Sequence, residues 1–153
     1  MSRNIDPTQY LLAALLWMAA LHLLWPVTTL VPAPWPLLGL IGLAIVIGIN
    51  PAAHGTLQAA GAGIKPDAES TALVICGVYR ISRNPMYFGC ILALAGIAGL
   101  PGSLTPWIVV ALFGIAADRV FIVAEECKLS ARFGAPWREY ASNTRRRIGF
   151  SAR

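Results

Sequence analysis

Two long stretches without a charged side chain constrain this sequence more than any other feature. Residues 7–64 and 84–117 contain no Asp, Glu, Lys or Arg. Each stretch is longer than the about 20 apolar residues that cross the hydrocarbon core of a bilayer. Each is also interrupted near its middle by a proline-containing segment, at residues 26–36 and 100–106. The pattern therefore predicts two helical hairpins, both apolar enough to enter a membrane.

Composition excludes the main alternatives to a membrane protein. Of the 153 residues, 57% are hydrophobic and 12% are charged, and a soluble domain carries about twice that charged fraction. This argues against a soluble globular enzyme, and the excess of apolar residues rules out a disordered chain. Three cysteines without metal-ligand spacing argue against a disulfide scaffold, and we expect no metal site.

The predicted fold is one all-α domain, a polytopic integral membrane protein with about four transmembrane helices in two hairpins. The expected spans cover residues 10–30, 35–54, 85–100 and 106–123, with a loop at 55–84 and a helical tail at 124–153. All twelve Lys and Arg residues lie outside the hairpin turns. The positive-inside rule then places both termini, the loop and the tail in the cytoplasm, so we expect the cytoplasmic (inner) membrane.

The net charge of +5 does not indicate a nucleic-acid partner. The basic run at residues 145–147 follows Trp137 and Tyr140, which favours contact with anionic lipid headgroups. His22 lies among leucines of the first span, where a packing role is expected. His54, near the end of the second span, either faces a cytoplasmic pocket or is structural.

The dipeptide Asn84-Pro85 predicts the start of the third span. Asparagine is a good N-cap, and proline is tolerated at the first helical position. Only about 16 residues then remain before Pro101, or ~24 Å of helix, which is shorter than the hydrocarbon core. We therefore expect this N-terminus to lie below the cytoplasmic interface. Its free amide groups and positive dipole end would then face a polar pocket open to cytoplasm and lipid.

A second polar cluster closes the fourth span. Asp118 and Arg119 interrupt its apolar run, and Glu125 and Glu126 follow about two turns later. Charged residues this close to a membrane line a cavity or pair with each other. Two interpretations stay open: a ligand site, or an ion-pair network in which Glu125 or Glu126 binds Arg83.

Two motifs carry a resemblance to a known family. The stretch LVICGVYRISRNPMYFG at residues 73–89 resembles the signature of the membrane methyltransferases related to isoprenylcysteine carboxyl methyltransferase and the phospholipid methyltransferases. Residues 125–140, EECKLSARFGAPWREY, are similar to the second signature of that family. The resemblance implies S-adenosylmethionine bound at the cytoplasmic face. It also implies methyl transfer by in-line SN2 displacement to a lipophilic or membrane-associated acceptor.

Carried over by motif position, the resemblance also implies a set of site residues. The expected cofactor-binding residues are Thr71, Ala72, Leu73, Val74, Tyr79, Arg83, Asn84, Pro85, Met86, Tyr87 and Glu125. The start of the third span and Arg83 suit the carboxylate of the cofactor, whereas Glu125 suits its ribose hydroxyls or its amino group. Arg119, Glu126 and His54 are candidates for substrate contact, and no catalytic base is assigned.

Two other functions remain possible from the sequence. One is a non-enzymatic small membrane subunit or transporter-like protein, and the other is an NADPH-dependent enzyme like the sterol reductases. The expected partners are a lipophilic small molecule or lipid as substrate and the surrounding membrane lipids, without nucleic acid. The acceptor atom (oxygen, nitrogen or sulfur) and the oligomeric state are left open.

Overall fold

The computed structural model describes residues 7–25, 37–61 and 72–146, and every element in these ranges is a helix, which confirms the all-α class. The elements are α1 (Pro7–Leu24), α2 (Leu38–Ala59), the short 3-10 helix η2 (Gly77–Arg80), α3 (Pro85–Gly99), α4 (Thr105–Ala116), the π-helix η3 (Ala117–Phe121), α5 (Ile122–Phe133) and α6 (Ala135–Asn143).

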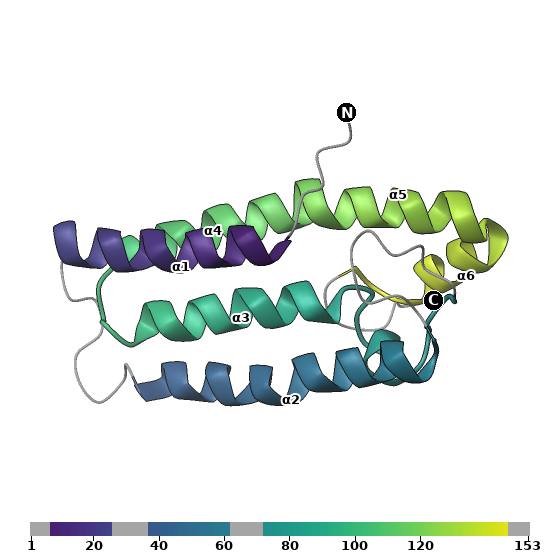
Figure 1. The fold of residues 1–153 in the computed structure, drawn as a ribbon, viewed down its shortest axis with the longest axis horizontal. Helices are drawn as coiled ribbons and strands as arrows, with labels where there is room; N and C mark the ends of the chain where they lie inside the picture. The colour runs from purple at the N-terminus through teal and green to yellow at the C-terminus, as the bar shows by residue number, and fades with distance from the viewer. Residues whose placement is uncertain (1–6, 26–36, 62–71, 147–153) are drawn as a thin grey trace.

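The long helices lie side by side in one bundle (Figure 1). Helix α3 lies in its middle and packs against α2 on one side and α4 on the other, while α1 packs on α4. Leu94 and Ala98 of α3 and Phe113 of α4 are among the buried residues of the main apolar cluster, together with Met18 of α1. The helices that the uncharged stretches form therefore bury one face against each other.

Helices α2 and α3 approach closely because glycines face each other across their contact. A Cβ atom on Gly39 would lie 2.3 Å from the Gly96 carbonyl oxygen, and one on Gly96 would lie 2.6 Å from that of Gly39. Both obstacles are backbone atoms, which cannot swing aside. Small residues at such contacts let helix backbones pack tightly, as they do in membrane proteins.

Helices α4, η3 and α5 form one continuous helix, Thr105–Phe133, of 29 residues. At 1.5 Å per residue its length is about 43 Å, well beyond a hydrocarbon core of about 30 Å. The helix therefore continues past residue 123, the predicted end of the membrane span, into the segment predicted as a helical tail. The π-turn at Asp118 and Arg119 carries the helix through the charged residues, and it ends only at Gly134, where φ is +56°.

The other boundaries follow the prediction more closely. Helix α3 (Pro85–Gly99) matches its predicted range. Helix α2 begins at Leu38 and continues through Ala59, five residues into the predicted loop. Helix α1 starts earlier than predicted, at Pro7, and ends at Leu24; the predicted residues 26–30 and 35–36 lie outside the described part of the chain.

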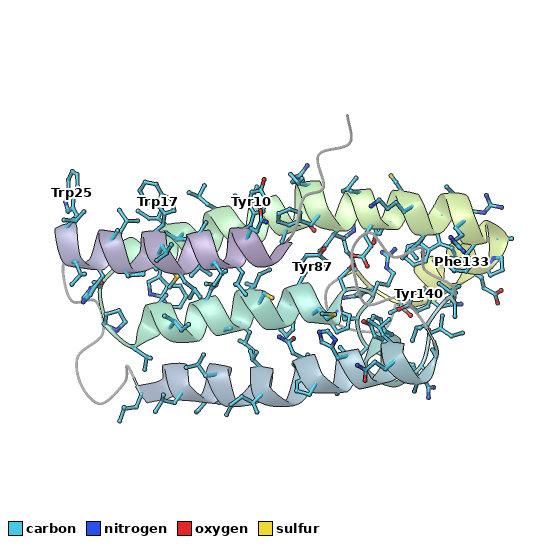
Figure 2. All side chains as sticks on the ribbon, in the orientation of Figure 1. Tyr10, Trp17, Trp25, Tyr87, Phe133 and Tyr140 are labelled. Carbon is cyan, nitrogen blue, oxygen red and sulfur yellow. The ribbon has the colours of Figure 1, made fainter. Side chains whose placement is uncertain are left out.

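The surface of the bundle suits a membrane. Helix α2, over Gly39–Ala59, and the continuous helix Thr105–Phe133 are long and apolar enough to cross a bilayer, whereas α1 and α3 are apolar but shorter. Only 6% of the most apolar stretch of α2, within Gly39–Ala59, is buried inside the protein. Trp17 and Trp25 project from the outer side of α1 (Figure 2). Apolar surface this extensive marks contact with lipid or another protein rather than with water.

Candidate active site

The first turn of α3 lacks the cap that its sequence predicts. The helix begins at Pro85, as expected, but the side chain of its N-cap residue, Asn84, makes no capping hydrogen bond. The Asn84 amide Nδ2 instead donates to the Arg146 carbonyl at 3.3 Å. Asn84 therefore occupies the N-cap position, as predicted, but its side chain does not bond the first turn. The segment that follows α6 runs beside Asn84 and offers its amide a carbonyl acceptor.

This segment is bound to the loop before α3 at three points. The backbone N–H of Arg83 donates to the Arg145 carbonyl at 3.1 Å. Besides Asn84, the Ser82 hydroxyl donates to the Arg146 carbonyl at 3.4 Å. Ser82 and Asn84 are buried. The loop before α3 and the segment after α6 are thus joined by one backbone–backbone hydrogen bond and by two hydrogen bonds from side chains of the loop.

Glu126 is the centre of an ion-pair network. Its carboxylate lies 3.2 Å from the Arg83 guanidinium and accepts two hydrogen bonds from Arg146, one of them from Nε at 3.2 Å. The Glu126 and Arg83 side chains are only 13% and 15% exposed. Arg83 also lies over the Trp137 ring, 5.9 Å from its centroid. The ion-pair interpretation therefore applies to Glu126 and Arg83.

Arg146 corrects a second expectation. The basic run was expected to face lipid headgroups, but the Arg146 guanidinium points inward to Glu126 and lies 4.0 Å from Asp118. The adjacent Arg145 is exposed, and Arg147 lies outside the described residues. The carboxylates of Glu126 and Asp118 on the continuous helix therefore bind this arginine side chain, in place of lipid headgroups.

The neighbouring glutamate, Glu125, has a different partner. It shares a side-chain hydrogen bond with the hydroxyl of Tyr87 in the first turn of α3. The Tyr87 ring stacks on the Phe121 ring, with centroids 6.1 Å apart. The Tyr10 ring of α1 packs edge-on against Phe121 as well, with centroids 5.1 Å apart. Figure 2 shows Tyr87 between α3 and the continuous helix. Tyr87 and Glu125 thus lie together beside the uncapped helix start.

An apolar wall faces the same region from the loop. Val74 and Tyr79 are buried against Ala53 of α2, and Met86 packs on this group. The Tyr140 hydroxyl of α6 donates to the Tyr79 carbonyl at 2.6 Å. Burial raises the pKa of the Tyr140 phenol to about 12, against an opposing effect of Arg83. The pKa of Tyr79 is also raised, by burial and then by the negative charge of Glu125, so both phenols stay protonated at neutral pH.

The expected site residues divide into three groups. Those from the loop and the start of α3 come together, with Glu125, around the first turn of that helix: Val74, Tyr79, Arg83, Asn84, Pro85, Met86, Tyr87 and Glu125. Ala72 and Leu73 lie partly buried at the start of the same loop segment, whereas Thr71 lies outside the described residues. Of the substrate-contact candidates, Glu126 is part of the ion-pair network. His54 follows Ala53 on α2 and is partly buried.

Arg119, the third candidate for substrate contact, lies on the surface of the continuous helix. Its side chain is 80% exposed, and its guanidinium lies 3.8 Å from the neighbouring Asp118 carboxylate. His22 behaves as expected, since its Nδ1 lies 2.9 Å from the Ser103 hydroxyl in a packing contact. Among the described residues, no group of three or more His, Cys, Asp or Glu side chains gathers in a metal-binding arrangement.

Sequence reasoning missed one buried polar group of α2. The Asn50 side-chain oxygen is buried and has no hydrogen-bond partner among the described residues. It lies against α3, where a Cβ on Gly89 would come within 2.3 Å of it. An amide in an otherwise apolar, uncharged span is costly and was the signal available for finding it. The Gly89 of the first motif is thus the residue that makes room for Asn50.

The fold and the buried polar cluster define a helical membrane protein with a polar site at one end of its bundle. Residues 34–135, about two thirds of the chain, match the family model described as phospholipid methyltransferase. The chain belongs to the phospholipid methyltransferase family, which agrees with the resemblance of its two motifs. No curated protein and no solved structure matches the chain at a significant level.

Proposed function

We propose that this protein transfers a methyl group from S-adenosylmethionine to a lipophilic or membrane-associated acceptor at the cytoplasmic face of the membrane. One observation carries the proposal beyond the family assignment. The start of α3 has no side-chain cap, and it lies beside the Tyr87–Glu125 pair. A helix start with free amide groups next to a carboxylate complements an amino acid moiety, which the cofactor contains.

The proposed topology has four spans. Helices α1 and α3, of 18 and 15 residues, would cross the membrane together with α2 and the continuous helix. At about 22 Å, α3 is shorter than the hydrocarbon core, so its start would lie inside the membrane boundary. Backbone without helical partners is tolerated there only in a protein-lined or watery cavity. The distribution of Lys and Arg supports a cytoplasmic position for the loop, α6 and both termini.

The residues present fit the chemical groups of the cofactor. The first-turn amides of α3 would hold its carboxylate, and Glu125 its ammonium group or ribose hydroxyls. Val74, Tyr79 and Met86 would form an apolar wall for adenine, since they pack in one cluster. Arg83 is bound by Glu126, so we assign it to the ion-pair network rather than to the cofactor.

The proposed reaction needs little acid–base catalysis by the protein. When bound, the cofactor supplies a methyl group on a sulfonium, which is already an activated leaving group. The task of the protein is then to align the acceptor with that methyl group and to exclude water. Tyr87, held by Phe121 and Glu125, lies beside the uncapped helix start, where it would contact the bound cofactor. A carboxylate or thiolate acceptor needs no base, whereas a protonated amine must lose a proton first.

Calorimetric binding to detergent-purified protein tests the cofactor assignment. We expect wild type to bind S-adenosylmethionine and S-adenosylhomocysteine, and Glu125→Gln to bind both about tenfold more weakly because a charged hydrogen-bond acceptor is lost. Glu139→Gln is the matched control, because Glu139 is an exposed glutamate on α6. Binding by neither ligand in wild type, or equal binding by Glu125→Gln, would contradict the proposal.

A further inference from the structure

The segment after α6 does more than close the fold. Residues 144–146, here called the C-terminal strap, carry both the carbonyl that holds the Asn84 amide and the arginine that pairs with two carboxylates. Its anchors lie on two elements: Ser82 and Asn84 precede α3, whereas Glu126 lies on the continuous helix. The strap therefore fixes the start of α3 relative to that helix.

The most informative of these contacts is the one to Asn84. An asparagine directly before a helix ordinarily turns its side-chain oxygen toward the first-turn amides. Here the side chain is buried, and its Nδ2 donates at 3.3 Å to the carbonyl of Arg146. In the orientation that this strap contact holds, the Asn84 side chain makes no capping hydrogen bond to its own helix.

We propose that Arg146 is a positioning residue that acts through Asn84, holding it away from α3 so that the first-turn amides stay available to the carboxylate of the ligand. This inference rests on the proposed function, since the carboxylate is that of the cofactor. Arg146 does not touch the ligand. Its side chain anchors the strap, and the strap carbonyl holds Asn84.

The anchor is strong enough for this role. The Arg146 guanidinium donates to Glu126 through Nε and Nη2, and Nη1 lies 4.0 Å from Asp118. Planar, two-point contacts between arginine and carboxylate fix geometry as well as supplying attraction. The π-turn Ala117–Phe121 contains Asp118, and such turns commonly mark functional positions in helices.

The test compares two ligands that differ in the amino acid moiety. S-adenosylhomocysteine carries the carboxylate, whereas 5′-methylthioadenosine lacks the whole amino acid part. We expect Arg146→Ala to weaken the binding of S-adenosylhomocysteine about tenfold and to change the affinity for 5′-methylthioadenosine by no more than about twofold. Arg146→Lys should restore part of the lost affinity. Arg145→Ala is the control, because it removes the same charge from an exposed neighbour.

A second variant keeps the inference testable if Arg146→Ala does not fold. Asn84→Asp removes the Nδ2 donor to the strap and leaves an acceptor that is free to cap α3. We expect this variant to unfold at the same temperature as wild type or higher, because aspartate is a good N-cap. Its affinity for S-adenosylhomocysteine should nevertheless fall about tenfold, with 5′-methylthioadenosine little changed.

The outcomes separate the inference from the proposed function. If wild type binds neither ligand, the cofactor assignment fails and the positioning role falls with it. If wild type binds both and Arg146→Ala weakens them equally, the cofactor assignment stands and the positioning role is wrong. A selective loss of S-adenosylhomocysteine in both variants supports the positioning role, because a general loss of structure would not distinguish the two ligands.

Discussion

The two adjacent glutamates should separate cleanly on substitution, because one holds the structure and the other faces the proposed ligand. Glu126 receives hydrogen bonds or ion pairs from Arg83 and Arg146, and its side chain is 13% exposed. In Glu126→Gln the neutral amide would remove the carboxylate that pairs with both Arg83 and Arg146, and Arg146 would keep only the weaker pairing with Asp118 at 4.0 Å. The Nε of Arg83 already has no partner among the described residues. Removing one partner of a buried ion pair costs about 3–5 kcal/mol.

The exposure of Arg146 places this variant at the lower end of that range. Its side chain is 37% exposed, so water can replace part of what Glu126 supplied. We therefore expect Glu126→Gln to lose about 3 kcal/mol of the free energy of unfolding. At 2–4 °C for each kcal/mol, the unfolding temperature would fall by about 6–12 °C.

Glu125→Gln is the matched comparison. Glu125 is hydrogen-bonded to a neutral phenol, Tyr87, and an amide oxygen can replace the carboxylate in that bond. We expect a loss of no more than about 1 kcal/mol. Thermal unfolding in detergent, followed by tryptophan fluorescence, measures both variants. Equal unfolding temperatures for the two variants, or a larger loss in Glu125→Gln, would refute the division of roles.

Three further predictions follow from the packing and the buried phenols. Gly96→Ala should lower the free energy of unfolding by about 2 kcal/mol, since overpacking against a backbone oxygen costs up to about 3 kcal/mol and the helical alanine regains about 1 kcal/mol. Gly48→Ala, which meets nothing within 4 Å, should instead raise it, and denaturant titration of both variants checks the pair. Tyr140→Phe should lower the free energy of unfolding by about 1 kcal/mol, because the Tyr79 carbonyl loses its hydrogen-bond donor. Denaturant titration measures this change too. The phenol pKa of Tyr140 is raised from 10.0 to about 12. Its contribution to stability is therefore full below pH 10 and is lost between pH 10 and about 12, which unfolding temperatures across that range test, with Tyr140→Phe expected to flatten the decline.

The fold was predictable where the sequence carries a local signal. Pro85 set the start of α3 correctly, because proline is accepted at the first position of a helix and the uncharged stretch begins there. The sequence did not show that the fourth span and the predicted helical tail form one continuous helix, because charge alone does not stop a helix. The continuous helix passes Asp118 and Arg119 and ends only at Gly134, whose positive φ a glycine accommodates without strain.

The sequence predicted which residues gather around the start of α3, but not which contacts they make. The first motif brought the residues around the start of α3 together, yet which carboxylate pairs with which arginine depended on the tertiary structure. From the sequence, either Glu125 or Glu126 could pair with Arg83, and only the tertiary structure shows that the partner is Glu126. The inward turn of Arg146 was equally invisible, since its partners lie 20 or more residues away in sequence.

The most direct measurement of the central claim is methyl transfer in a lipid bilayer. Purified protein would be reconstituted into vesicles that contain ethanolamine phospholipids and supplied with S-adenosylmethionine labelled in its methyl group. We predict label in the lipid fraction with wild type, and a marked loss of this labelling with Glu125→Gln, while Glu139→Gln matches wild type. Absence of label with wild type, in these vesicles and in vesicles that contain prenylated cysteine acceptors, would contradict the assignment of the protein as a lipid-directed methyltransferase.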